Sequence, residues 1–328
     1  MTPPVAPVRT PKKRRARTTD RGLDRGFRYL AVWSGILILA VLASVAIFLI
    51  IEAWPALKNP DLASEVPWIP AGGNLWSVVG PLIFGTILAA IVSLVIAVPI
   101  AVGVALFISH YAPRRMASIL GYVVDLLAAI PSVVYGLWGV MVLAPKVQPV
   151  WQFLVDYFGW IPLFAGDQHG NASNPPRVLM TTAVVLAVMI LPIITAVSRE
   201  VFLQTPRLHE EAALALGATR WELVRMAVLP FGRSGVTSAA MLGLGRALGE
   251  TMAVLMILSP GILYSFKILV ASEQQTIAGN IAAKFNDAND IGRSTLIATG
   301  LALFVITLLV NLAARAIIAR NKEFSGAN

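Results

Sequence analysis

Long runs of apolar residues alternate with polar segments along the chain. Each run holds about 20 residues or more, enough for a helix to cross the hydrocarbon core of a membrane. None alternates strictly between apolar and polar positions, so helices are expected rather than membrane strands. The pattern predicts an all-α integral membrane protein with six transmembrane helices, at 29–51, 78–109, 117–143, 178–197, 234–258 and 292–318.

Prolines lie inside several of these runs. The run 78–109 contains Pro81 and Pro99 and is longer than a span requires, so it predicts either one kinked helix or a re-entrant segment followed by a span. Pro131 and Pro192 interrupt two further runs. Proline removes a backbone donor, and such breaks persist in membranes only where protein or a water-filled cavity satisfies the freed groups. The breaks are therefore expected to face protein or water.

The distribution of charge indicates the orientation. The 328 residues carry a formal charge of +9, and nine basic side chains lie within 1–29. If the N-terminus is cytoplasmic, the inside segments hold 19 basic residues and the outside segments four, which agrees with the positive-inside rule. We therefore expect cytoplasmic termini, a disordered arm at 1–29, a first transmembrane helix at 30–51, and a core of five helices at 78–320 that includes a cytoplasmic loop at 198–233.

This topology also limits the role of the basic arm. An anchor that contacts anionic lipid and fixes the orientation is the favoured interpretation. Nucleic-acid binding is the alternative, and no other feature of the sequence supports it. The first apolar run is too long for a signal peptide, whose core holds roughly 7–15 residues.

The composition excludes several kinds of chemistry. The absence of cysteine excludes disulfides and cysteine-ligated metals, and no phosphate-binding G-x-x-x-x-G-K-[ST] loop occurs. Asp167 and His169 could bind a metal, although a solvated loop is the favoured interpretation. We therefore expect no enzyme, no metal site and no cofactor held by this chain. Any ATP and Mg²⁺ would be used by a separate ATPase subunit.

The cytoplasmic loop contains signals for two short helices. Thr205–Pro206 predicts a helix start and Gly217 a helix stop. Thr219 and Glu222 form a capping-box pattern at the start of a second helix, which Pro230 is expected to end. Helices this short need something to pack on. An amphipathic hairpin on the lipid surface and a helix that docks into a partner's groove both remain open.

The segment "EAALALGATRWELVRMAVLP" resembles the EAA signature of ABC-importer permeases. Ala227 stands where that family usually has a larger aliphatic residue. In that family the loop is a coupling helix that sits in a cleft of a separate ATPase subunit. The resemblance implies ATPase coupling through the matching positions, Glu211, Ala212, Ala213, Gly217, Leu229 and Pro230.

The run 240–258 carries two opposite charges, Arg246 and Glu250. Because they are four residues apart, they are expected to share one helix face, either as a structural ion pair or along a transport path. Arginine suits an oxyanion, and a carboxylate could accept a hydrogen bond from an anion that still carries O–H groups. This pair therefore favours phosphate over sulfate or molybdate. Helix packing is expected at three nearby glycines, Gly243, Gly245 and Gly249.

The segments "LGRALGETMAV" (244–254) and "LLAAIPSVVYGLWG" (126–139) resemble those of the PstC-type permeases of phosphate importers. The resemblance covers roughly residues 27–320. It implies a type I ABC importer permease fold in the bacterial cytoplasmic membrane. It further implies a PstA-like second permease, a PstB-like ATPase dimer and an extracytoplasmic PstS-like phosphate-binding protein as partners.

By this resemblance, Arg246 and Glu250 lie on the path of phosphate. Asp125 is a further acid, for which a salt bridge and a pathway role both remain open. Three alternative functions remain: a permease for another oxyanion, a proton-coupled secondary anion transporter with Glu250 as relay, and a membrane scaffold or sensor.

Overall fold

A computed structural model describes residues 21–322, and every regular element in that range is helical. The elements include short 3₁₀ and π-helical segments, labelled η. In chain order they are α1 (Arg21–Lys58), α2 (Leu62–Glu65), α3 (Leu75–Leu106), η1 (Phe107–Tyr111), α4 (Arg114–Ala128), α5 (Ser132–Trp138), η2 (Gly139–Leu143), α6 (Ala144–Phe158), η3 (Pro162–Phe164), α7 (Leu179–Leu203), α8 (Arg207–Ala215), α9 (Arg220–Leu223), η4 (Val224–Val228), α10 (Leu229–Leu248), α11 (Met252–Ile257), α12 (Ile277–Lys284) and α13 (Asp290–Lys322).

The start of α1 differs from the sequence expectation. The helix begins at Arg21, so the prediction of a disordered arm is wrong for residues 21–29, while residues 1–20 lie outside the described part. Arginine and leucine are good helix formers, and they allow the apolar helix to extend into the basic segment. The chain divides after Phe48, and a second compact unit begins at Leu49 within α1.

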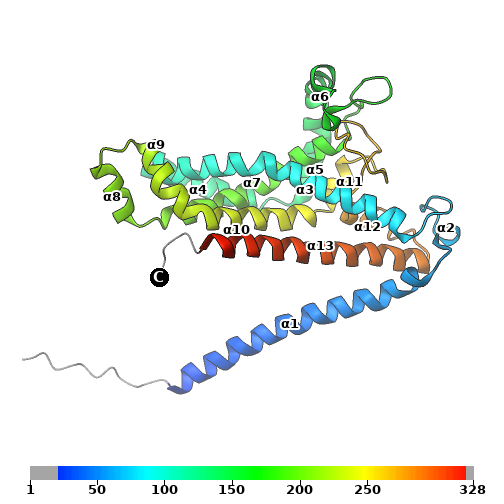
Figure 1. The fold of residues 1–328 in the computed structure, drawn as a ribbon, viewed down its shortest axis with the longest axis horizontal. Helices are drawn as coiled ribbons and strands as arrows, with labels where there is room; N and C mark the ends of the chain where they lie inside the picture. The colour runs from blue at the N-terminus through cyan, green and yellow to red at the C-terminus, as the bar shows by residue number, and fades with distance from the viewer. Residues whose placement is uncertain (1–20, 323–328) are drawn as a thin grey trace, which may run out of the picture. The chain divides into compact units, whose positions relative to one another are not determined.

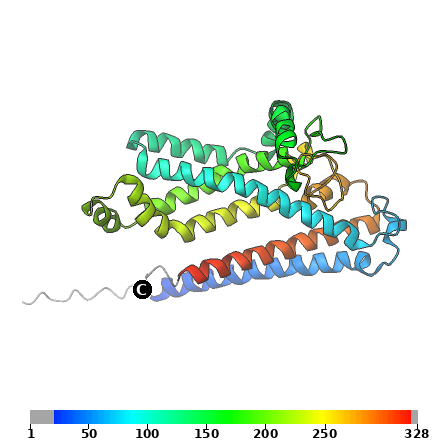
Figure 2. The same ribbon diagram turned by 45° about the horizontal axis from the view of Figure 1, so that its top comes forward.

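The centre of this second unit is formed by α3, α7, α10 and α13, which run side by side (Figures 1 and 2). Small residues permit the close approach of α3 and α7, since Ala97 and Ala101 are fully buried. The Thr195 hydroxyl of α7 donates to the carbonyl of Ala101 at 3.4 Å. Small side chains and interhelical hydrogen bonds are the usual means by which helices associate in membranes.

Five helices of the described part are long and apolar enough to cross a membrane, namely Gly26–Lys58, Leu75–Tyr111, Ser132–Phe158, Leu179–Leu203 and Asp290–Ala316. Four of them correspond to predicted runs. The run 78–109 is one continuous helix, because both of its prolines are accommodated within α3. Pro192 likewise leaves α7 continuous. The all-helical membrane fold is therefore confirmed, with five candidate spans among the described residues where the sequence predicted six.

The two remaining runs are divided. The run 117–143 breaks at 129–131 into α4 and α5, because the residue before a proline avoids the helical conformation. From Ser132 the helix continues through η2 and α6 to Phe158, into a segment expected to be an outside loop. The run 234–258 breaks at 249–251 into α10 and α11. Both breaks fall inside the segments that resemble phosphate permeases.

The end of the unit that carries α2 and α12 lies opposite the end that carries α8 and α9 (Figure 1). The segment before α12 rests directly on α3. The Thr86 hydroxyl accepts from the backbone N–H of Ile277 at 2.9 Å, and a Cβ at Gly85 would collide with the carbonyl of Gln275. This contact holds the polar segment against the bundle.

Candidate functional site

The break between α10 and α11 places Arg246 and Glu250 in different settings. Arg246 lies in the last turn of α10, whereas Glu250 follows the end of that helix at Gly249. The Glu250 Oε1 atom accepts from the backbone N–H of Ala253 at 3.1 Å, and so satisfies an orphan donor of α11. The expectation that both charges share one face of a continuous helix is therefore wrong. The described ion pairs do not join them.

The break between α4 and α5 lies close to the first one. The Tyr135 hydroxyl donates to the carbonyl of Leu127 at 2.9 Å and so bridges the interruption. The second halves of the two divided helices, α5 and α11, pack together. A Cβ at Gly136 would lie 3.0 Å from the Cα of Ala253 and 3.1 Å from the sulfur of Met256. Divided helices that meet inside a bundle are a common construction of substrate sites in transporters.

A cavity of about 710 Å³ lies beside Arg246, between α7, α10 and α13. Its wall is mostly apolar, with polar side chains from α10 and α13: Ser238, Arg246, Asn311 and Arg315. Arg246 is partly exposed, while Glu250 is buried and does not line the cavity. The arrangement provides a cationic groove, since no described carboxylate pairs with either arginine. Sequence reasoning missed Asn311 and Arg315, because Arg315 was counted as a cytoplasmic flanking charge.

The glycines of α10 do not act alike. A Cβ at Gly243 would lie 2.8 Å from the Cδ1 atom of Ile194 on α7, so this glycine allows close helix packing. A Cβ at Gly245 would meet nothing within 4 Å, and Gly249 has only an ordinary contact with its own helix. Within this chain the packing expectation is met at Gly243, whereas Gly245 opens onto the cavity and Gly249 contacts only its own helix.

Asp125 lies in the last turn of α4 and does not line the cavity. Its Oδ2 atom is 4.0 Å from Nη2 of Arg199 on α7. Gly121, one turn earlier, leaves room for the Arg199 guanidinium. The geometry favours the salt-bridge interpretation over a pathway role.

The loop between α7 and α10 contains the two expected helices, α8 and α9. Gly217 ends the first with a φ of 82°, the left-handed conformation that glycine adopts readily. Thr219 and Glu222 form the predicted capping box at the start of the second. Hydrogen bonds from the backbone and hydroxyl of Thr219 hold the pKa of the Glu222 carboxyl below its usual range. These local sequence signals are confirmed.

Two boundaries of this loop were predicted wrongly. Pro206, not Thr205, is the N-cap of α8, and the Thr205 hydroxyl has no hydrogen-bond partner among the described residues. Pro230 lies in the first turn of α10, where its missing N–H is tolerated after the π-helical segment η4. As a result α9, η4 and α10 form one helical segment from Arg220 to Leu248.

One side of the loop is anchored and the other is open. Ala213 and Leu223 pack in a small apolar cluster with Phe202 of α7. Leu208 and Leu216 are 78% and 84% exposed. Exposed leucines on a short helical pair suit a partner's groove or the lipid surface, the two alternatives that the sequence leaves open.

A polar contact joins this loop to α3. The His110 Nε2 atom of η1 lies 3.5 Å from Glu210 Oε1 of α8, and the Ser109 hydroxyl contacts His110 Nδ1 at 2.7 Å. The sequence gives no signal for this pair, because the two residues are one hundred positions apart. The contact ties the loop to the end of a central helix.

The remaining EAA positions differ in exposure. Glu211 and Ala212 are exposed, Ala213 is buried, and Leu229 lies half-buried at the start of α10. This division matches a loop with one face on the bundle and one available face.

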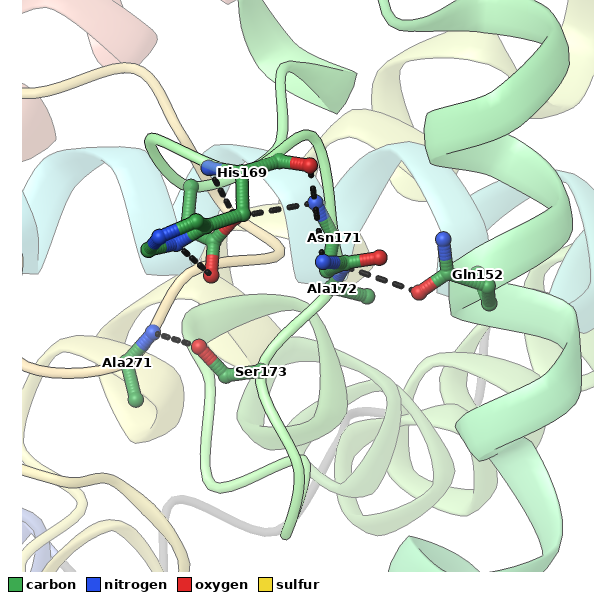
Figure 3. Close-up of polar contacts among 7 residues, drawn as sticks. Gln152, His169, Asn171, Ala172, Ser173 and Ala271 are labelled. Carbon is green, nitrogen blue, oxygen red and sulfur yellow. Dashed lines mark hydrogen bonds and ion pairs between the residues drawn. The ribbon is translucent and has the colours of Figure 1, made fainter.

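Asp167 and His169, for which the sequence left metal binding open, lie in a compact turn (Figure 3). Asp167 Oδ1 accepts from the backbone N–H groups of His169 and Asn171, at 2.8 and 2.9 Å. These bonds lower the pKa of the Asp167 carboxyl. Gln152 of α6 secures the turn by accepting from Ala172 N–H at 3.0 Å. Within residues 21–322 no group of three potential His, Cys, Asp or Glu ligands gathers, so the turn resembles a structural loop.

Comparison with known proteins identifies the family to which this architecture belongs. Residues 97–323 match the family described as "Binding-protein-dependent transport system inner membrane component". The "Phosphate transport system permease protein PstC 2" of Mycobacterium tuberculosis is 46% identical over 310 residues, 92% of this chain and 93% of the relative. A PstC protein of Mycobacterium leprae is also 46% identical, over 83% of this chain and 86% of the relative.

A solved structure shares the fold. It is that of a bacterial ABC transporter involved in the import of the acidic polysaccharide alginate, with a TM-score of 0.52 and 15% identity. The likeness covers 89% of this chain and 98% of that chain. Together with the long apolar helices, the family match identifies a multi-pass membrane transport subunit rather than an enzyme. The chain belongs to the family of binding-protein-dependent transport system inner membrane components, with the type I ABC importer permease fold.

Proposed function

We propose that this chain is the PstC-type permease subunit of an ATP-driven importer and carries inorganic phosphate across the bacterial cytoplasmic membrane. The observation that carries the proposal is the position of Arg246, at the end of a divided helix and on the wall of a cavity. Relatives that match most of the chain are named as phosphate permeases. A guanidinium remains charged when partly buried and presents a planar fork to an oxyanion.

Glu250 complements this cation from the other side of the break. One carboxylate oxygen, Oε1, is engaged by Ala253 N–H. Glu250 is buried beside the cavity rather than on its wall, so its other oxygen would accept a hydrogen bond from an O–H group of phosphate only once the break opens during transport. Sulfate at neutral pH has no such group and would be repelled. Glu250 therefore supports a preference for phosphate while it stabilises the start of α11.

The assembly follows from the open face of the loop. An ATPase subunit of a PstB-like dimer would cover Leu208 and Leu216 and would hold the ATP and Mg²⁺. A PstA-like permease would complete the pathway, and a PstS-like protein would deliver phosphate on the outside. The termini and the α8–α9 loop would be cytoplasmic, in agreement with the charge distribution. Closure of the ATPase dimer would then be transmitted through Glu211, Gly217 and their neighbours.

The test is transport by the reconstituted complex. The chain is placed in proteoliposomes with its permease partner, ATPase and binding protein, and uptake of labelled phosphate and sulfate is measured with and without internal ATP. We expect ATP-dependent uptake of phosphate in preference to sulfate. Equal sulfate uptake would contradict the substrate assignment. Uptake without ATP that collapses with the proton gradient would instead support a secondary transporter.

A further inference from the structure

The cavity beside Arg246 is lined by a second basic side chain, to which the proposed function assigns no role. Arg315 lies near the C-terminal end of α13 and lines the same cavity. Asn311, one helical turn earlier, lines it as well. Residues four apart share a helix face, so α13 presents a guanidinium and an amide together to the groove.

The facing side of α10 is shaped to keep this groove open. Ser238 and Arg246 both line it and are two helical turns apart, about 12 Å along the axis. Between them Gly245 also lines the cavity, and a Cβ there would meet nothing within 4 Å. On α13, Ala314 lines the groove and is buried at 6% exposure, and this helix packs beside α10. The groove is therefore elongated, with basic side chains contributed by two helices.

The two arginines stand at different depths. Arg246 lies in the last turn of α10, far from the α8–α9 loop, with which that helix is continuous at its other end. The two helices run in opposite directions (Figure 1), so the C-terminal part of α13 lies towards the loop end. Arg315 thus lies nearer than Arg246 to the face proposed as cytoplasmic. Neither is paired with a carboxylate in the described part of the chain.

We propose that Arg315, with Asn311, is a second oxyanion contact, which receives the anion after Arg246 on its way to the cytoplasmic face. The inference rests on the proposed function and deepens it. Passage requires that the ion bind strongly enough to enter the pathway. It also requires that the binding be shared among several weaker sites, so that the ion can leave. Two fixed cations along one groove allow the anion to leave the first while it gains charge-assisted hydrogen bonds at the second.

The test uses the absence of native cysteine from this chain. Arg315→Cys introduces a single thiol, and its modification by an aminoethyl methanethiosulfonate is followed by the mass of this chain in the reconstituted complex. We expect inorganic phosphate at ten times its apparent dissociation constant to slow modification about tenfold. Sulfate at equal ionic strength should protect less. Arg293→Cys, on the same helix but outside the cavity, provides the matched control and should show no protection.

Uptake provides the second measurement. Arg315→Gln should lower phosphate uptake at limiting phosphate about tenfold, equivalent to about 1.4 kcal/mol. Arg315→Lys and the aminoethyl-modified Arg315→Cys should recover most of the loss, since both restore a positive charge, whereas a sulfonatoethyl adduct should not. Arg293→Gln should transport normally.

The outcomes separate the two proposals. If the wild-type complex takes up phosphate but Arg315→Gln does so equally well, or phosphate leaves the modification rate unchanged, Arg315 merely extends to the lipid surface and the inference is overturned. If the wild-type complex takes up no phosphate at all, the proposed function itself fails.

Discussion

The α8–α9 loop and the α10–α11 break both interrupt helices, yet they satisfy the freed backbone groups differently. In the loop, the necessary partners are close in sequence, with Gly217 ending one helix and the Thr219–Glu222 box starting the next. In the break, Glu250 supplies one acceptor, Arg177 donates to the carbonyls of Met256 and Ile257, and α11 packs above all on α5, more than one hundred residues away. The loop is therefore a local construction, whereas the break depends on the assembled bundle. This difference determines how each region should respond to substitution.

The largest effect is expected at the break, from Arg246→Gln. Loss of the charge-assisted contacts of a guanidinium, worth roughly 2.7 kcal/mol, should lower phosphate uptake about 100-fold. The complex should still assemble, because Arg246 has no described ion-pair partner. Uptake at limiting phosphate is the measurement, and Arg246→Lys should retain part of the activity. Normal uptake by Arg246→Gln would show that the α10–α11 break does not lie on the pathway of phosphate.

A packing substitution should also separate the two regions. Gly136→Val at the α5–α11 contact should cost roughly 1–3 kcal/mol, because the new side chain has no room beside Ala253. Gly245→Val offers the matched control, since it points into the cavity. Thermal unfolding of the detergent-solubilised complex measures the difference. Similar melting temperatures for both variants would show that α5 does not support α11.

Glu250→Gln tests whether this residue distinguishes anions or only stabilises the helix start. The amide oxygen can still accept from Ala253 N–H, so the fold should persist. Neutralising the carboxylate removes the repulsion of sulfate, and we expect the phosphate-to-sulfate uptake ratio to fall about tenfold, equivalent to about 1.4 kcal/mol. Loss of all uptake with an unchanged ratio would assign Glu250 to positioning alone.

A substitution in the α8–α9 loop should uncouple phosphate import from ATP hydrolysis. Gly217→Ala places a Cβ in the left-handed conformation at a cost of roughly 1 kcal/mol, although nothing surrounds it within 4 Å. We expect fewer phosphate ions imported per ATP hydrolysed, with little change in anion preference. Gly103→Ala, equally unobstructed but with an ordinary backbone, serves as control. Unchanged coupling in Gly217→Ala would contradict the docking of this loop on an ATPase.

The smallest effect concerns pH. The lowered pKa of Glu222 means that its cap contributes fully above the unfolded pKa and weakens as the pH falls through the folded value. Coupling should therefore decline slightly in acid, and Glu222→Gln should remove that dependence. Parallel pH profiles of phosphate import per ATP for the two proteins would argue against a role for the capping box.

These contrasts also explain which parts of the structure were predictable. The cap at Thr219 and the stop at Gly217 depend on neighbouring residues, and a single sequence contains that information. The break at Gly249 could not be predicted from the sequence. The chain leaves the helix there with a φ of −93°, and not in the left-handed conformation that a helix-ending glycine usually adopts. Spacing alone placed Arg246 and Glu250 on one helix. Arg315 was missed for a related reason, since only tertiary packing brings it beside Arg246.

The continuous helical segment from Arg220 to Leu248 has a mechanical consequence. It is about 40 Å long, with the capping box at one end and Arg246 at the other. A rigid rod of this length acts as a lever, so a tilt of about 5° at the loop would displace the Arg246 end by about 4 Å. No chain of side-chain rearrangements is needed to carry a signal between them. The π-helical turn at Val224–Val228 would then be the point where the stiffness of this rod can be tuned.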